Sequence, residues 1–190
     1  MRRLILIRHG PTHAKSMIGW TDRPADLSDS AKIARLAAAL PPAPVISSDL
    51  SRAVETATAI APAAPRLAHD PGLREIHFGA WEDRRWADIN AETPDAIRAF
   101  WEEPGDTTAP GGESWNALRA RVDAAVDRAL AAVQGDLIVV CHFGAILTQL
   151  QRARRVPTTT IFGQKIEPLS LSEIAIDGTS WHERRANHEP

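Results

Sequence analysis

Leu4-Ile-Leu-Ile-Arg-His-Gly10 places four branched aliphatic residues directly before two basic residues and a glycine. A second stretch, Leu137-Ile-Val-Val-Cys-His-Phe-Gly144, repeats this design near the other end of the chain. An apolar run of four residues is too short to cross a bilayer or to act as a secretory signal, and branched aliphatic residues favour strands. Each stretch therefore predicts a buried strand that ends in a histidine and a glycine turn.

The remaining sequence alternates apolar runs of strand length with stretches of helical period, which is typical of an α/β fold. Further strands are expected at residues 45–47 and 169–176, the latter as an edge or half-exposed strand. Helices are expected at residues 29–40, 49–61, 95–101 and 114–133. We therefore expect a three-layer α/β/α fold with a mostly parallel sheet and helices on both faces. Residues 1–190 are expected to form one domain.

The composition excludes several classes of protein. The 190 residues include 22 basic and 24 acidic side chains, which give a formal net charge of −2, and 44% of them are hydrophobic. A chain with this balance is not attracted as a whole to nucleic acid or to an anionic membrane surface. The lone cysteine, Cys141, excludes an internal disulfide and a cysteine-rich zinc module. This cysteine usage fits a reducing compartment, and we expect a cytoplasmic protein.

Basic and histidine side chains follow three of the predicted strands. Arg8 and His9 follow the first strand, Arg52 lies in the first turn of the helix after the second, and His142 follows the third. Because ligands of parallel sheets bind outside the carboxyl ends of the strands, we expect these four side chains to share one site. Arginine holds phosphate through paired, charge-assisted hydrogen bonds. The sequence therefore predicts a cationic cup for one phosphate group.

A histidine in such a cup can act as a nucleophile. Neighbouring arginines disfavour the imidazolium form, and a neutral ring nitrogen can attack phosphorus. The reaction also needs an acid for the leaving oxygen. Our candidate is Glu75, in the irregular segment Leu73-Arg-Glu-Ile-His-Phe-Gly-Ala-Trp-Glu82, although Glu82 and Asp83 are close to it in sequence. Since no P-loop and no metal-binding motif occurs, we expect neither a cofactor nor a metal.

Five blocks of the sequence together resemble one known family. They are Leu6-Ile-Arg-His-Gly-Pro-Thr12, Ser47-Ser-Asp-Leu-Ser-Arg-Ala-Val-Glu-Thr56, Leu73-Arg-Glu-Ile-His-Phe-Gly-Ala-Trp81, Pro110-Gly-Gly-Glu-Ser114 and Val140-Cys-His-Phe-Gly144. In this order and spacing they resemble the histidine phosphatase superfamily, also called phosphoglycerate-mutase-like. The resemblance spans most of the chain and implies a phosphoglycerate-mutase-like fold.

The resemblance also implies a role for each candidate residue. It makes His9 the nucleophile that becomes phosphohistidine, and it makes Glu75 the proton donor to the leaving group and then the base that activates water. The residues that it implies as phosphate holders are Arg8, Arg52 and His142. Further contacts with phosphate or substrate are expected from Gly10, Thr12, Trp20, Glu113 and Phe143.

Three positions depart from the family pattern. Phe143 follows His142, where many members carry glycine, so we expect its ring to form a wall over the leaving group while its backbone N–H faces the phosphate. Pro11 stands where glutamate is common, and Lys15 stands where many members carry asparagine. These departures leave the phosphate chemistry intact and bear on which substrate the site accepts.

Simpler roles stay open for some of these residues. Arg52 could form an ion pair with Glu55 or Asp49 on its own helix, and Thr12 could be a plain turn residue. Glu113, in a Gly-Gly-Glu-Ser segment before a predicted helix, could belong to a helix cap.

Two neighbouring pairs invite other chemistry that the sequence does not favour. His9 and His13 are four residues apart, but Gly10-Pro11 prevents the regular helix that would align both rings on a metal. Cys141 precedes His142 at the end of a strand, so their side chains point to opposite faces and do not pair. Cys141 is expected to be a small buried side chain.

Three functions fit this site. The first is a phosphatase acting on a small phosphorylated metabolite, with α-ribazole phosphate as one candidate because Gly19-Trp-Thr-Asp22 and Pro110-Gly-Gly-Glu-Ser114 resemble such phosphatases. The second is a mutase that returns the phosphate to its substrate, but family mutases are generally longer than 190 residues. The third is a catalytically silent phosphate-binding module. The sequence does not indicate an oligomeric state.

Overall fold

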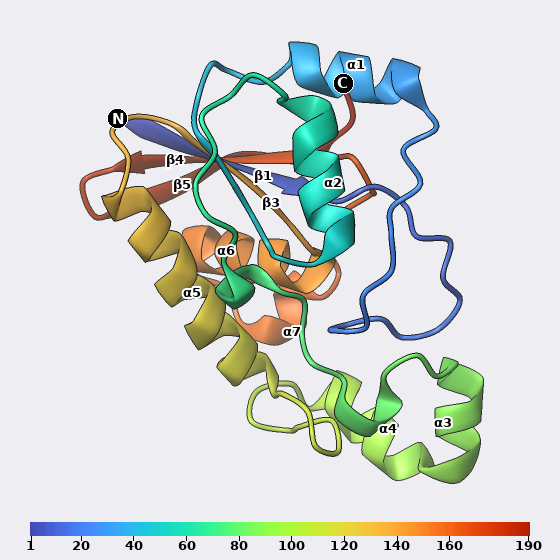
Figure 1. Ribbon diagram of the computed structural model, residues 1–190. Helices are drawn as coiled ribbons and strands as arrows, with labels where there is room; N and C mark the ends of the chain where they lie inside the picture. Colours follow the sequence, from blue (N-terminus) through green and yellow to red (C-terminus); the bar gives the residue numbers. More distant parts are fainter.

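A mixed sheet of five strands forms the centre of the computed structural model, which describes residues 1–190 (Figure 1). The strands are β1 (Arg2–Arg8), β2 (Val45–Ser47), β3 (Leu137–Cys141), β4 (Leu171–Asp177) and β5 (Ser180–His188). The helices are α1 (Ser30–Ala38), α2 (Ser51–Ile60), α3 (Trp86–Glu92), α4 (Pro94–Glu102), α5 (Trp115–Ala131), α6 (Phe143–Arg154) and α7 (Thr158–Ile161). Two single-turn 3₁₀ helices lie at Pro71–Leu73 and Gly79–Trp81.

The sheet is mixed, and the expectation of a mostly parallel sheet is wrong. The strand order is β2-β3-β1-β4-β5. β1 and β2 run parallel to β3, whereas β4 runs antiparallel to β1 and β5 runs antiparallel to β4. The two-residue turn Gly178-Thr179, where Gly178 has a φ of 56°, joins β4 and β5 as a hairpin, and only antiparallel strands can be joined by so short a connection.

The predicted edge strand is also placed differently. β4 is bonded to β1 on one side and to β5 on the other, and all of its residues except the last are buried. β5 takes the edge position instead. Its sequence, Ser180-Trp-His-Glu-Arg-Arg-Ala-Asn-His188, is largely polar and half exposed, which explains why no apolar run marks it as a strand.

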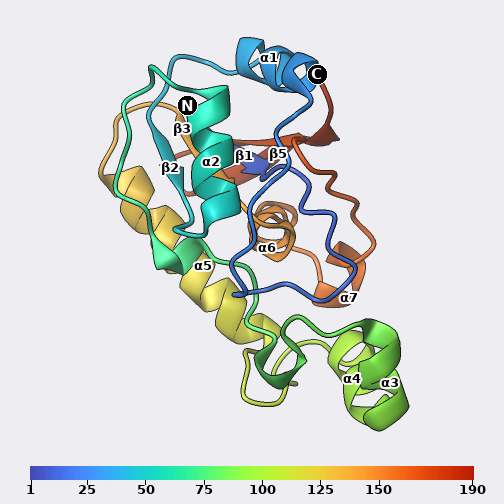
Figure 2. The same cartoon turned by 45° about the vertical axis from the view of Figure 1, so that its right-hand side comes forward.

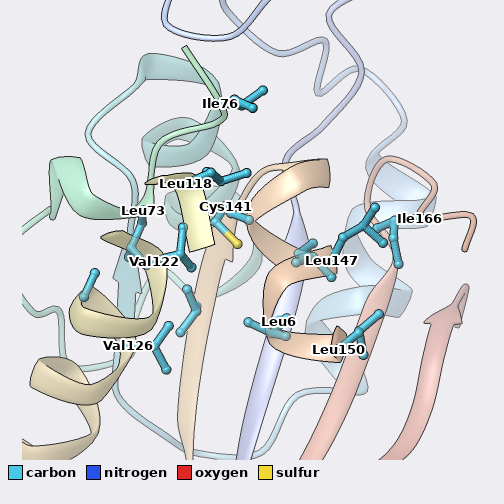
Figure 3. Packing of buried hydrophobic residues seen from close by; sticks show 14 of the residues in the cluster. Leu6, Leu73, Ile76, Leu118, Val122, Val126, Cys141, Leu147, Leu150 and Ile166 are labelled. Carbon is cyan, nitrogen blue, oxygen red and sulfur yellow. The ribbon is translucent and has the colours of Figure 1, made fainter. Parts of the chain in front are cut away.

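Alternate residues of the central strands build two cores on opposite faces of the sheet. Leu4 and Leu6 of β1 belong to the larger cluster, which includes residues of α5 and α6. Ile5 and Ile7 belong to the smaller cluster, which includes residues of α1 and α2. Figure 3 shows Leu6 in the larger cluster, between the helices that cover that face. The prediction of helices on both faces of the sheet is therefore confirmed.

Most predicted helices occur close to their expected bounds. The Asp29 side chain caps α1 by accepting a hydrogen bond from the Lys32 N–H (2.9 Å), and Ser114 caps α5 by accepting from the Ala117 N–H (3.2 Å). The structure adds α3, α6 and α7, which the sequence pattern does not reveal. α6 is buried on most of its surface, so it lacks the polar stripe that identifies an amphipathic helix.

The helices α3 and α4 pack on each other and extend away from the sheet, beyond the N-terminal end of α5 (Figure 2). α4 occurs where a helix is expected at residues 95–101, whereas α3 lies in a stretch where the sequence shows no sustained period. None of the seven helices combines the length and apolar character needed to cross a bilayer.

The core predicts a large effect for one deletion. Leu6 is fully buried, so Leu6→Ala should lower the free energy of unfolding by about 2–5 kcal/mol, because it removes buried methyl groups and leaves a cavity. The matched control is Trp86→Ala, which truncates a side chain that is 53% exposed and should cost about 1 kcal/mol or less. Urea unfolding measures both values. Equal losses for the two variants would show that the larger core does not depend on β1.

Candidate active site

The carboxyl ends of β1, β2 and β3 carry the predicted cup. His9 follows β1, and its backbone N–H donates a hydrogen bond to the Cys141 carbonyl at the end of β3 (3.1 Å). His142 directly follows β3 and is the N-cap residue of α6, and Arg52 is the second residue of α2. The structure thus brings together Arg8, His9, Arg52 and His142, whose charges and rings influence one another.

Hydrogen bonds at Nδ1 determine where each histidine carries its proton. The two rings lie with their centroids 5.0 Å apart. His9 Nδ1 lies 2.7 Å from the Gly10 carbonyl oxygen, which can only accept, so Nδ1 carries the proton and Nε2 keeps its lone pair. His142 Nδ1 accepts from Arg52 Nε (3.2 Å), so the proton of His142 is on Nε2. This buried Nε2 has no hydrogen-bond partner within the protein.

Both histidines are neutral because of burial and nearby positive charge. Burial lowers the pKa of His9 to about 3, and the positive charges of Arg52 and Arg8 contribute to this shift. The pKa of His142 lies well below its usual range, chiefly through burial and then through the effects of His9 and Arg52. At neutral pH the site therefore holds two uncharged imidazole rings beside two guanidinium groups.

The two arginines are held by carbonyl oxygens. Arg52 is 1% exposed, and its two terminal nitrogens donate to the carbonyls of Gly19 (2.7 Å) and Thr21 (2.9 Å). Arg8 donates to the Ile166 carbonyl, and its buried Nε has no partner within the protein. Burial lowers the pKa of both arginines. Because carbonyls satisfy the donors without cancelling the charge, the cup stays positive.

The ion pair considered for Arg52 does not form. Asp49 instead forms a two-point ion pair with Arg74, with distances of 2.8 and 2.6 Å. The hydrogen bonds of the Arg52 guanidinium all go to His142 and to the loop at residues 19–21.

Glu82 holds the loop that receives Arg52. Its carboxylate accepts from the backbone N–H groups of residues 19, 20 and 21, from the Thr21 hydroxyl (2.6 Å) and from the Phe78 N–H (3.0 Å). Burial raises the pKa of Glu82, but these hydrogen bonds outweigh burial and lower it overall. From the sequence alone, Glu82 is only an alternative to Glu75 as the acid. Its role in shaping the loop depends on contacts that no local motif encodes.

Glu75 lies between the cup and the start of α6. It is 8% exposed, and its two carboxylate oxygens accept from the backbone N–H of Gly144, at 3.1 and 3.0 Å. Oε1 also accepts from the Ile76 N–H (2.9 Å). A Cβ at position 144 would lie 2.3 Å from Glu75 Oε1, so glycine is required for this close approach. The geometry separates Glu75 from Glu82, which is fully occupied by the loop.

Thr56 connects Gly10 to α2 and was not predicted as a site residue. Its hydroxyl accepts from the Gly10 N–H (2.9 Å) and donates to the Arg52 carbonyl (2.7 Å). The Gly10 N–H is therefore used within the protein, and Gly10 contributes its carbonyl, which orients His9. One signal in the sequence could have pointed to Thr56: it lies four residues after Arg52, on the same face of the helix.

The other residues predicted to contact phosphate or substrate make hydrogen bonds, ion pairs or ring contacts with other parts of the protein. The Thr12 hydroxyl accepts a long hydrogen bond from the Ala14 N–H (3.5 Å), as a turn residue does. Trp20 Nε1 donates to the Glu75 carbonyl (2.9 Å). Glu113 forms an ion pair with Arg121 (2.7 Å) and thereby supports the segment around Glu75. Phe143 lies with its ring 5.4 Å from the Arg8 guanidinium carbon, beside the cup.

His13 and Cys141, which the sequence places close to His9 and His142, contribute no side chain to the cup. His13 has a left-handed backbone with a φ of 54°, and its exposed ring pairs with Asp26 (2.8 Å). Cys141 is buried in the larger core, and burial raises the pKa of its thiol. Across the molecule, no group of three or more His, Cys, Asp or Glu side chains is arranged to hold a metal ion.

Comparisons with known proteins match this arrangement to one family. The model of the histidine phosphatase superfamily (branch 1) matches residues 4–189. Glucosyl-3-phosphoglycerate phosphatase of Mycolicibacterium vanbaalenii is 36% identical over 142 residues, which cover 70% of this chain and 59% of that protein. The chain spans 52% of the length of the first curated relatives that it matches.

Solved structures agree with the sequence match. A mycobacterial glucosyl-3-phosphoglycerate phosphatase superposes with a TM-score of 0.86 at 26% identity, over 100% of both chains. The α-ribazole phosphatase of Shigella flexneri superposes with a TM-score of 0.85 at 24% identity, over 98% of this chain and 96% of that one, and this likeness shows the fold alone. From the family match and the geometry of the cup together, the chain belongs to the histidine phosphatase superfamily.

Proposed function

We propose that the protein is a phosphatase that hydrolyses a small phosphomonoester through a phosphohistidine on His9. One observation carries this proposal: two neutral imidazole rings lie beside the buried Arg52 and the half-buried Arg8, which carbonyls, and not carboxylates, hold in place. The buried His142 Nε2–H and Arg8 Nε–H have no acceptor within the protein. Phosphate oxygens are strong hydrogen-bond acceptors, and they carry the negative charge that would balance the arginines of the cup. The relatives named as phosphatases support the same reaction.

In the first step the lone pair of His9 Nε2 attacks phosphorus. The N–P bond forms as the P–O bond to the alcohol breaks, and the leaving oxygen takes a proton from the Glu75 carboxyl group. The Gly10 carbonyl stabilises the developing imidazolium through His9 Nδ1–H. The guanidinium groups of Arg8 and Arg52, together with His142 Nε2–H, stabilise the charge on the transferred phosphoryl oxygens.

The second step reverses these roles. Glu75, now a carboxylate, removes a proton from a water molecule whose oxygen attacks phosphorus. The N–P bond breaks, inorganic phosphate leaves, and the bonding pair returns to His9 Nε2. The enzyme ends the cycle with neutral His9 and protonated Glu75, so protons and electrons balance without a metal or a cofactor.

Hydrolysis of a simple aryl phosphate tests the proposal. The wild-type protein should release phosphate from 4-nitrophenyl phosphate in the presence of EDTA, and His9→Asn should reduce kcat/KM at least about 1,000-fold because it removes the nucleophile. Circular dichroism should show that the variant is folded. If the wild-type protein releases phosphate no faster than His9→Asn does, the protein is not a phosphatase, and a catalytically silent phosphate-binding module is favoured.

A mutase makes the same intermediate but returns the phosphoryl group to the substrate. We propose hydrolysis, and the distinction is measurable with 3-phosphoglycerate and its bisphosphate primer. Phosphate release should outpace formation of 2-phosphoglycerate. Faster isomerisation than release would overturn the choice of a phosphatase.

The two roles of Glu75 predict an uneven effect of Glu75→Gln. For benzyl phosphate, whose alcohol leaves poorly, kcat/KM should fall roughly 10²- to 10⁴-fold because the proton donor is lost. For 4-nitrophenyl phosphate, whose alcohol leaves easily, the rate of the first step should fall less than the rate of the second. Stopped-flow traces should therefore show a burst of nitrophenolate equal to the enzyme concentration. Asp83→Asn, a neighbouring carboxylate paired with Arg23, is the matched control and should keep wild-type rates. Equal losses for both esters without a burst would contradict these roles.

The neutral state of His9 predicts how stability depends on pH. The pKa of His9 is about 3 in the folded protein and about 6.5 in an unfolded chain. Between these values the unfolded state binds a proton that the folded state does not, so the free energy of unfolding falls as the pH is lowered through this window. His9→Asn should reduce that slope by about 1.4 kcal/mol per pH unit. Urea unfolding across the window measures it, and identical slopes for the two proteins would refute a neutral buried His9.

A further inference from the structure

An apolar cavity begins at Glu75 and extends away from the cup. Its volume is about 330 Å³, which lies within the range of small-molecule sites. Its walls come from the segment around Glu75, from α4 and the loop after it, from α5 and α6, and from Phe162 directly after α7. The six aromatic side chains among its lining residues are Phe78, Phe100, Trp101, Trp115, Phe143 and Phe162.

The cavity adjoins the position where the leaving oxygen must lie. Glu75 and Gly144 line it, and the N–H of Gly144 holds the Glu75 carboxylate. Phe143 also lines it and contacts the Arg8 guanidinium of the cup. Because the acid must reach the ester oxygen, the group attached to that oxygen starts at Glu75 and continues into the cavity.

The cavity walls carry no positive charge. Glu75 is their only ionisable side chain, and no arginine, lysine or histidine is among the lining residues. The indole N–H of Trp115 donates to Gln151 Oε1 (2.9 Å), so its ring offers the cavity only apolar surface. A carboxylate or second phosphate placed here would lose water without gaining a counter-charge, which is costly.

Aromatic contacts hold the walls in place. Trp115 and Phe162 meet edge to face with ring centroids 4.8 Å apart, and Phe100 and Trp101 meet in the same way at 5.0 Å. Trp101 is 41% exposed, although it lines the cavity. Such rigid ring surfaces suit another planar apolar group, which can stack or pack edge-on against them.

We propose that the substrate is the phosphomonoester of an uncharged, aromatic alcohol, whose ring occupies this cavity while its phosphate lies in the cup. The inference rests on the proposed phosphatase function and narrows its substrate class. Phosphorylated sugar acids and phosphoglycerates, which carry a carboxylate beside the phosphate ester, are the class that this cavity disfavours.

Three esters with similar leaving alcohols test the substrate class: 4-methylbenzyl, benzyl and 4-carboxybenzyl phosphate. Their kcat/KM values should fall in that order, with the first at least about tenfold above the last. The methyl group of the first ester adds apolar surface to the cavity, and only the third ester brings a charge into it. Equal values, or a preference for the carboxylate, would overturn the proposal.

Variants of the lining residues test the cavity itself. Trp101→Ala should reduce the ratio of kcat/KM for 4-methylbenzyl phosphate over methyl phosphate about tenfold. The matched control is Trp86→Ala, which removes an exposed tryptophan that does not line the cavity and should keep the wild-type ratio. Thr107→Arg adds a cation to the wall and should raise kcat/KM for 4-carboxybenzyl phosphate relative to benzyl phosphate. If both tryptophan variants change the ratio equally, the ring does not enter the cavity.

Binding separates failure of this inference from failure of the proposed function. The phosphonate analogues of 4-methylbenzyl and 4-carboxybenzyl phosphate cannot be hydrolysed, and calorimetry measures their affinities for the wild-type protein without turnover. Tighter binding of the methyl compound supports the substrate class even if no ester is hydrolysed. Equal or inverted affinities contradict the cavity proposal while leaving hydrolysis of other esters intact.

Discussion

Arg52 is a positive charge buried almost completely without a carboxylate partner, and much of the surrounding structure serves to hold it there. Burial of an unpaired charge is costly unless hydrogen bonds replace its water. The carbonyls of Gly19 and Thr21 supply these bonds, and Glu82 holds the loop that presents them. The guanidinium also determines the tautomer of His142 through Nε. The positive charge is therefore available to an anion in the cup.

The fold supplies this arrangement through the parallel part of the sheet. β1, β3 and β2 end at the same edge, so residues distant in sequence meet there. The antiparallel hairpin β4–β5 flanks β1 on its other side, and β4 contributes to both cores. α6 begins directly after β3, which places His142 in the cup and the Gly144 N–H on Glu75 within three residues. One strand-to-helix junction thus joins the cup to Glu75.

The parts that follow from local pattern could be predicted. The apolar runs at β1 and β3 and the amphipathic stripe of α5 are visible because each buries one regular set of residues. β5 and α6 were missed for opposite reasons, since one is too polar for a core strand and the other too buried for an amphipathic helix. The direction of β4 and its central position depend on pairing with distant strands, which no local pattern encodes.

In the candidate site, too, some features could be predicted from local sequence and others could not. Arg8, His9, Arg52 and His142 could be predicted to meet because each follows a recognisable strand. The supporting contacts of Thr56 and Glu82 could not, since their hydrogen bonds join residues 46 and more than 60 positions apart in the sequence. The aromatic cavity is equally hidden, because its rings come from five separate segments that only the tertiary structure assembles.

The central claim is that phosphate in the cup becomes bonded to His9. Mass spectrometry of Glu75→Gln, mixed with 4-nitrophenyl phosphate and quenched in base, tests it most directly, because phosphohistidine survives base and the variant hydrolyses it slowly. The account predicts one phosphoryl group on the tryptic peptide that begins at His9, directly after Arg8, and none on the same peptide of the His9→Asn variant. A phosphoryl group on another residue, or none during measurable turnover, would contradict it.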